Sequence, residues 1–122
     1  MKASEYRSFI RKNKYHAKKT YVGDILFDSK KEARRYSTLC EWERFGVITN
    51  LQRQVVFELQ PGYTSNQGKK VQPIRYIADF TYERDSKRIV EDTKSAATRT
   101  REYLIKRKIF EYKYPEYTFV ES

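Results

Sequence analysis

Hydrophobic residues recur with a helical period over positions 29–46. The apolar positions lie three or four residues apart, which is typical of one face of an amphipathic helix. They are Ala33, Tyr36, Leu39 and Cys40. Ser29 precedes this run as an N-cap, and Glu32 follows Ser29 at the capping-box spacing. Because Gly46 can take the left-handed conformation that ends many helices, the pattern predicts a helix between Ser29 and Gly46.

A second helical pattern covers positions 100–114 and stops before Pro115. Its apolar residues form a single stripe that includes one lysine. The stripe consists of Leu104, Ile105, Lys108, Ile109 and Tyr112. A lysine in such a stripe either extends its ammonium to water along an apolar surface or faces a DNA backbone. Both interpretations of Lys108 stay open at this point.

Four segments have the apolar character and the bounding turn residues of β-strands. They lie at positions 50–62, 74–83, 88–94 and 117–121. The second and third are separated only by a short polar turn, so we expect them to form an antiparallel hairpin. A small hairpin is expected at 20–27, and a polar loop at 63–73.

The strand at 74–83 has two unlike faces, because strand side chains alternate. One face is apolar and aromatic: Tyr76, Ala78, Phe80 and Tyr82. The other face carries Asp79 between Ile77 and Thr81. A carboxylate is costly in such a strand unless it is paired or binds a metal.

The predicted order of elements is α-β-β-β-α-β, which indicates the α/β class with a mixed sheet. A chain of 122 residues favours one domain, which we place at 21–122. Aromatic residues at 16% argue against disorder despite 34% charged residues. Residues 1–20 form a basic N-terminal extension, and a short helix is expected there at 4–13.

The chain carries a formal net charge of +10. Nucleic acid is the partner that best explains this excess, and the plain alternative is a basic protein with a well-solvated surface. No apolar run approaches the roughly 20 residues that a membrane helix needs, and the N-terminus lacks the apolar core of a signal peptide. Cys40 is the single cysteine, which excludes an internal disulfide and a cysteine zinc site. We expect no membrane partner and a cytoplasmic protein.

Asp79 and Asp92 are expected at similar depth on the two paired strands of the hairpin. Lys94 lies two residues after Asp92, on the same face, whereas Glu91 points to the opposite face. Two neighbouring carboxylates favour a divalent cation such as Mg²⁺, which binds carboxylates, waters and phosphate oxygens. The alternative is a structural salt bridge between these aspartates and Lys94.

Several segments together resemble the PD-(D/E)XK nuclease superfamily: "FDSKKEA", "YIADF" and "VEDTK", in the predicted order of elements. The chain more closely resembles a family of small phage and prophage endonucleases implicated in Holliday junction resolution. The resemblance covers about Lys14 to Val120, and it implies a restriction-endonuclease-like αβββαβ core. The sequence has Ala78 where the motif name has proline, a departure that is common in the superfamily.

The resemblance also implies a role for individual residues. Asp79 and Asp92 are the metal-ligating and catalytic acids, and the backbone carbonyl of Thr93 is a further metal ligand. Lys94 is the catalytic lysine. Glu32 matches a helix-borne glutamate that many members add to the site, although it also occupies the capping-box position. An alignment shifted to Glu91 would place acid and lysine on opposite faces, so we reject it.

The remaining candidate residues are basic or polar and surround this site. Arg99 and Arg101 precede or begin the second helix, whose N-terminus favours anions. Gln54 is a weaker candidate for support of the site. The other candidate DNA contacts, each of which has an ordinary solvated surface as its alternative, are Lys18, Lys19, Lys69, Lys70 and Lys108.

These observations lead us to expect an endonuclease that hydrolyses DNA phosphodiesters by metal-activated water, with Mg²⁺ as cofactor and Mn²⁺ as a substitute. Branched DNA, such as a Holliday junction, is the expected substrate. The resemblance also implies a homodimer, since symmetric resolution needs two opposed nicks, and a location in the bacterial host cytoplasm. The alternatives are a flap, nicking or restriction-like endonuclease, a non-catalytic DNA-binding module, and an adaptor that binds an acidic protein.

Overall fold

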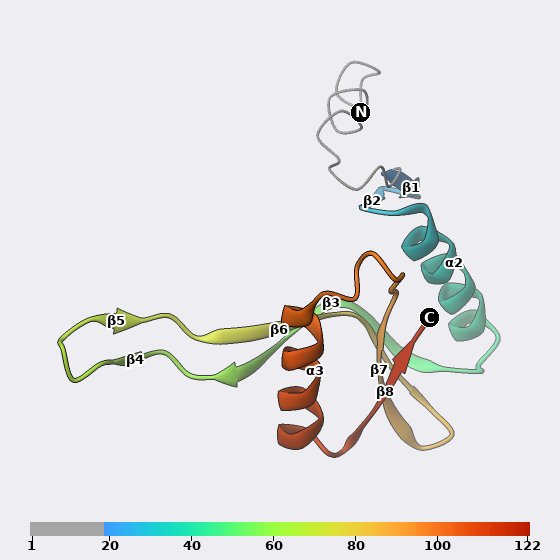
Figure 1. Cartoon of the computed structure of the whole chain (residues 1–122). Helices are drawn as coiled ribbons and strands as arrows, with labels where there is room; N and C mark the ends of the chain where they lie inside the picture. Colours follow the sequence, from blue (N-terminus) through green and yellow to red (C-terminus); the bar gives the residue numbers. More distant parts are fainter. Residues whose placement is uncertain (1–18) are drawn as a thin grey trace.

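The computed structural model describes residues 19–122, so the helix expected at 4–13 lies outside the described residues. Its centre is a four-stranded sheet with the order β3-β6-β7-β8 (Figure 1). The strands are β3 (Thr49–Gln60), β6 (Ile74–Arg84), β7 (Lys87–Asp92) and β8 (Tyr117–Glu121). The pairs β3–β6 and β6–β7 are antiparallel, and β7–β8 is parallel, so the sheet is mixed.

Two helices accompany this sheet, α2 (Lys30–Arg44) and α3 (Arg101–Lys113). The principal elements therefore follow the order α-β-β-β-α-β, which confirms the predicted fold class. A small hairpin of β1 (Thr20–Val22) and β2 (Ile25–Phe27) precedes α2, as predicted, and turns at Gly23 with a positive φ of 59°. No helix in the described part of the chain has the length and apolar character to cross a membrane.

The helices pack on opposite faces of the sheet and form two separate cores. Ile89 belongs to the α2 core and Val90 to the α3 core, as expected for neighbouring residues of one strand. The α2 core contains Phe27, Ala33, Leu39, Ile48, Phe80, Tyr82 and Ile89. The α3 core contains Phe57, Leu59, Tyr76, Ala78, Val90, Tyr103 and Phe110. The four alternating apolar residues of β6 are buried as predicted, but they divide between these cores.

This division follows from where β6 and β7 separate. Their pairing begins at Arg84↔Lys87, across a turn in which Asp85 and Ser86 have positive φ, and it ends at Phe80↔Glu91. Beyond that point β6 pairs only with β3, and such two-stranded ribbons twist strongly. The tight turn fixes the register and brings Asp79 next to Asp92.

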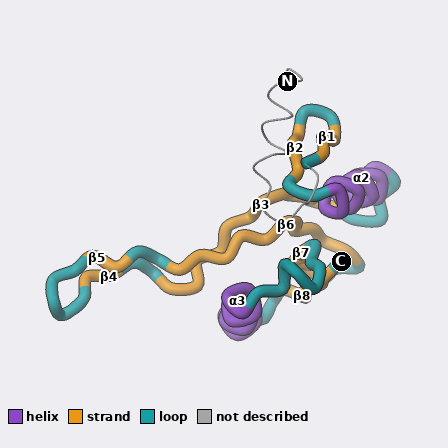
Figure 2. Tube along the Cα trace, turned by 45° about the horizontal axis from the view of Figure 1, so that its top comes forward, coloured by secondary structure: helices purple, strands orange, loops and turns teal. Residues whose placement is uncertain are grey.

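The β3–β6 ribbon continues away from the sheet as a projecting arm (Figures 1 and 2). Its tip contains two short paired strands, β4 (Tyr63–Thr64) and β5 (Lys70–Val71). The prediction of a polar loop at 63–73 was therefore wrong in part. The two-residue strands are too short to produce an alternating pattern, and Gly68, with φ of 80°, helps to close their turn.

The stripe predicted along α3 faces solvent instead of the core. The structure buries Tyr103 and Phe110, which contact the aromatic rings contributed by the sheet. Ile105 is 52% exposed and Tyr112 is 90% exposed, and Lys108 lies on the same exposed side. The aromatic and aliphatic residues both recur at helical spacing, so the period alone could not identify the buried side.

Candidate active site

Asp79 and Asp92 lie at the point where β6 and β7 separate. The backbone N–H of Asp79 donates to Oδ1 of Asp92 over 2.9 Å. The backbone N–H of Thr93 donates to Oδ2 of Asp79, also over 2.9 Å. The two carboxylates therefore accept hydrogen bonds from backbone amides just beyond the last ladder pair. The expected proximity of the two aspartates is confirmed.

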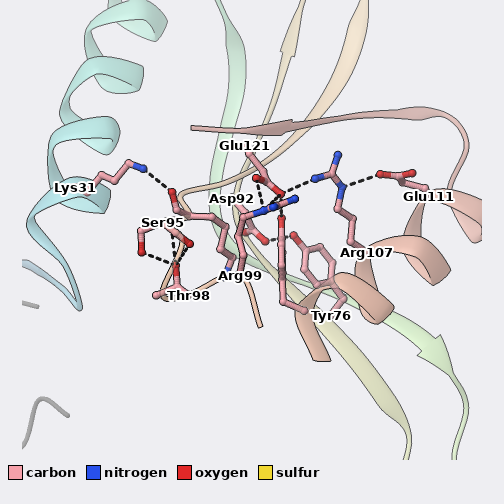
Figure 3. Close-up of polar contacts among 11 residues, drawn as sticks. Lys31, Tyr76, Asp92, Ser95, Thr98, Arg99, Arg107, Glu111 and Glu121 are labelled. Atoms are coloured by element: carbon pink, nitrogen blue, oxygen red, sulfur yellow. Dashed lines mark hydrogen bonds and ion pairs between the residues drawn. The ribbon is translucent and has the colours of Figure 1, made fainter. Parts of the chain in front are cut away.

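Asp92 is 2% exposed, and protein donors contact both of its carboxylate oxygens. The second donor is the hydroxyl of Tyr76, which forms a short hydrogen bond to Oδ2 (Figure 3). Burial raises the pKa of Asp92, and the hydrogen bonds from Tyr76 and from the Asp79 amide act in the opposite direction. Oδ1 of Asp79 has no hydrogen-bond partner among residues 19–122, so it is available to a ligand.

Burial and mutual repulsion raise the pKa values of the neighbouring carboxyls. Burial, followed by the charge of Asp92, raises the pKa of Asp79 to about 6. The hydrogen bond from the Thr93 amide and the charge of Lys94 act to lower this pKa. Burial, followed by the charge of Asp79, raises the pKa of Glu32 to about 7. Since Asp92 also contributes to that second rise, three carboxyls from α2, β6 and β7 share one electrostatic environment.

Glu32 lies at the start of α2 and close to the two aspartates, and its predicted role in the site stays a prediction. Its backbone N–H donates to Oγ of Ser29 over 3.1 Å, which confirms the N-cap. Its side chain accepts a hydrogen bond from Nε2 of Gln54 over 3.4 Å. The carboxylate therefore lies toward the aspartates, while the main chain begins α2.

Gln54 has an unusual backbone for a strand residue, with φ of 51°. It lies in the ladder between the pairs Arg53↔Phe80 and Val55↔Ala78, at the level of Asp79. A non-glycine residue in the left-handed region costs roughly 1–2 kcal/mol, and such strain gathers at functional positions. Gln54 contacts Glu32, and its supporting role in the site stays a prediction.

Lys94 lies beside the two aspartates and lowers the pKa of each. Its Nζ is 4.4 Å from the centre of the Tyr103 ring. Two hydrogen bonds hold the main chain of Lys94. Its N–H donates to the carbonyl of Ser122 over 3.1 Å. Its carbonyl accepts from Nζ of Lys31 over 2.5 Å (Figure 3). Lys31, contributed by α2, was missed in the sequence because no local pattern indicates this long-range contact.

Glu91 forms the structural ion pair of this region. It is fully buried and accepts two hydrogen bonds from Arg35, over 2.6 and 3.0 Å. The hydroxyl of Tyr82 donates a third over 2.6 Å. Glu91 therefore faces the α2 core, on the side opposite Asp92, as the alternation of strand side chains required.

The candidate DNA contacts are not gathered in one place. Arg99 is ion-paired with Glu121 over 3.1 Å, and Glu121 also accepts from Arg107 over 2.5 Å (Figure 3). Partial burial acts to raise the pKa of Glu121, but Tyr103 and these arginines lower it. The other candidates lie elsewhere: Arg101 at the start of α3, Lys108 on its exposed side, Lys69 and Lys70 in the arm tip, and Lys19 beside Asp28. Lys18 lies outside the described residues.

Two basic residues near the site were missed in the sequence. Arg75 and Lys106 line a cleft that also contains Asp92 and Lys94 and has a volume of about 270 Å³. Arg75 precedes Asp79 by four residues, and the strand period indicated that the two share a face. The approach of Lys106 depends on the docking of α3, for which the sequence offered no signal.

The oxygen donors at this site suit a hard cation. Asp79 and Asp92 supply carboxylates, and Glu32 adds a third in the same electrostatic environment. Between residues 19 and 122, no three His, Cys, Asp or Glu side chains form a ready-made metal-binding group. Mg²⁺ is commonly bound by only one or two protein carboxylates, with waters and substrate phosphate completing its shell. The pair of aspartates therefore fits Mg²⁺ or Mn²⁺.

Comparison with known proteins identifies one family. Neither the comparison with curated proteins nor that with solved structures gave a match. Residues 12–121 match the family described as "Protein of unknown function (DUF1064)". This match spans nearly the whole chain and includes every element of the central sheet and the candidate site. The chain belongs to this family.

Proposed function

We propose that this protein is a metal-dependent endonuclease that hydrolyses DNA phosphodiester bonds. The observation that carries the proposal is a pair of hydrogen bonds, from the Asp79 amide to Asp92 and from the Thr93 amide to Asp79, with Lys94 alongside. The structural ion pair of this region is formed by Glu91 and Arg35, not by the two aspartates. Among residues 19–122, the buried Asp92 has no ion-pair partner, and one carboxylate oxygen of Asp79 accepts no hydrogen bond.

The roles of the residues follow from their contacts. Asp79 and Asp92, with the backbone carbonyl of Thr93, would hold a Mg²⁺ or Mn²⁺ ion. When bound, such an ion polarises the phosphate and lowers the pKa of water. Tyr76 and the Asp79 amide fix the orientation of the Asp92 carboxylate. Lys94 stabilises the negative charge that develops on the phosphate during attack.

Glu32 and Gln54 complete the site from α2 and β3. With a pKa of about 7, Glu32 can accept and release a proton near neutral pH, as a general base or acid requires. The side-chain amide of Gln54 donates a hydrogen bond to one carboxylate oxygen of Glu32. The proposed role of Glu32 is to orient the attacking water and to accept its proton.

DNA is the proposed substrate because the chain has a net charge of +10, and nucleic acids are the polyanions that cells offer in abundance. The ordered motifs that resemble the PD-(D/E)XK superfamily support the same conclusion. The sequence contains no zinc-finger or recognition-helix motif, so we propose selection by DNA shape. A branched DNA such as a four-way junction is the proposed substrate.

The exposed side of α3 supports a homodimer. Ile105 and Ile109 lie there beside Ile74 in an apolar groove of about 570 Å³, and such patches commonly mark interfaces. A two-fold axis across this helix makes the two α3 helices antiparallel. We propose a second copy of this chain as the occupant of this face.

The function is tested by cleavage of a labelled immobile four-way junction and a linear duplex of matched sequence. Wild type and Asp92→Asn are compared in Mg²⁺, Mn²⁺ and EDTA. Paired nicks in the junction that need the metal and disappear in the variant are the expected result. Binding of the junction without cleavage in either metal would instead identify a non-catalytic DNA-binding module.

A further inference from the structure

A cleft lies between the base of the arm and the first half of α3. Arg75 and Ile77 form its wall on β6, and Thr100 and Lys106 form the wall on the helix side. Asp92 and Lys94 of the candidate active site also line this cleft. Its volume of about 270 Å³ is slightly below that of pockets for drug-sized ligands and suits one nucleotide better than a base pair.

Two cationic side chains of the cleft, Arg75 and Lys106, can bind a phosphate. Arg75 is exposed, and its guanidinium forms no ion pair or hydrogen bond in the described part of the chain. Lys106 is paired over 3.2 Å with Glu102, which lies one helical turn away and also lines the cleft. Glu102 is 77% exposed, and such surface pairs contribute little, so Lys106 can exchange this partner for a phosphate at small cost.

The cleft also has an apolar surface that a regular DNA duplex cannot use. Ile77 lines the cleft and is 53% exposed, and its partner across the ribbon, Val56, lies next to the lining residues and is 54% exposed. Ile77 lies two residues before Asp79 and therefore on the same face of β6. A duplex presents phosphates and sugars to a protein edge, whereas an unpaired base presents an apolar ring face.

We infer that this cleft binds one unpaired nucleotide next to the phosphate that is cut. Its phosphate contacts Arg75 and Lys106, and its base packs on Ile77 and Val56. The inference rests on the proposed function for the position of the cut. Selectivity for branched DNA would then arise in this cleft, because a nucleotide leaves the base stack at a branch far more easily than within a continuous duplex.

The test uses two DNAs of the same sequence: a fork with one unpaired nucleotide beside the branch, and a linear duplex. The fluorescent base 2-aminopurine replaces the unpaired base and reports its packing. Binding and fluorescence are measured in EDTA, where metal-dependent cleavage cannot occur, and cleavage is measured separately in Mg²⁺. Each variant is exposed at its substituted position, and thermal unfolding verifies that it folds.

Joint substitution of Ile77→Ala and Val56→Ala is expected to weaken fork binding about fivefold and to remove the 2-aminopurine signal, because it deletes buried methyl groups. Arg75→Ala is expected to weaken fork binding about tenfold by loss of a charged hydrogen bond. Val47→Ala and Arg88→Ala replace similarly exposed residues outside the cleft. These controls are expected to change binding less than about twofold.

Two results separate this inference from the proposed function. Fork binding with the expected variant pattern, but no cleavage of any DNA, would support the cleft and overturn the hydrolase. Cleavage with equal losses on fork and duplex in the Ile77 and Val56 variant, or an unchanged 2-aminopurine signal on binding of wild type, would overturn the cleft. The second pattern would leave the hydrolase intact.

Discussion

Glu91 and Asp92 are adjacent in β7 and both are buried, yet they face opposite sides of the sheet. Glu91 is held by Arg35 and Tyr82 in the α2 core. Asp92 accepts from Tyr76 and from the amide of Asp79 at the point where the strands separate. One strand therefore supplies a structural carboxylate and a candidate catalytic carboxylate in consecutive positions, and substitutions can separate the two roles.

Glu91→Gln is expected to destabilise the fold and to preserve DNA cleavage. The change leaves Arg35 without its charged partner, and breaking a buried pair costs about 3–5 kcal/mol. Arg35 is 25% exposed, so water can solvate part of its charge, and we expect a loss of about 2 kcal/mol in the free energy of unfolding. Thermal unfolding should show a melting temperature lower by roughly 6–12 °C.

Asp92→Asn is expected to show the opposite pattern. The variant keeps the size of the side chain and removes a carboxylate that burial already penalises, so its melting temperature should be at or above that of wild type. Cleavage of the junction should fall by at least about 100-fold, since loss of a metal ligand exceeds the usual effect of its supporting contacts. A variant that cleaves at full rate would contradict the proposed role of Asp92.

Stability without metal is expected to fall as the pH rises from about 5 to 8. The folded-state pKa values of Asp79, about 6, and Glu32, about 7, lie above the unfolded values near 4. The folded protein therefore binds protons more tightly, and the stability from these groups is full below the unfolded values and is lost as the pH passes the folded ones. Melting temperatures in EDTA across this range test the prediction.

Magnesium should counteract the fall in stability with rising pH, because protons and the cation compete for the same carboxylates. The increase in melting temperature on addition of Mg²⁺ should be larger at pH 8 than at pH 5. Glu32→Gln provides the control: its melting temperature in EDTA should depend less on pH over this range. An increase that is the same at both pH values would contradict binding at these carboxylates.

Ile105→Glu is expected to convert the protein from a dimer to a monomer. The change introduces a charge on the exposed side of α3, where Ile105 is 52% exposed in the single chain. The monomer should fold, since Ile105 lies outside both cores. Light scattering coupled to gel filtration measures the mass, and Val47→Glu is the control for an added surface charge. A wild type that is monomeric at all concentrations tested would contradict the proposed interface.

The sequence predicted the hairpin well, because the short turn after Arg84 fixes the register that brings Asp79 to Asp92. Ser29 likewise identified the start of α2. The buried side of α3 was not predictable, since its aromatic and aliphatic stripes have the same period. The position of Lys106 in the cleft depends on how α3 docks, which is a long-range property that no local pattern encodes.

Gln54 combines backbone strain with a contact to a candidate catalytic group, so Gln54→Gly should separate stability from activity. Glycine removes the penalty of roughly 1–2 kcal/mol for the left-handed backbone, and it adds about 0.5–1 kcal/mol of entropy loss on folding. The net effect should be a gain of about 0.5–1 kcal/mol in stability. Activity should fall, because Glu32 loses the amide that holds its carboxylate.

Gln54→Ala keeps the strain but deletes the same amide, so the two variants should lose similar activity while differing in melting temperature. Equal melting temperatures would show that the strain at residue 54 is no larger than the entropy cost of glycine, and retained activity in both would remove Gln54 from the site.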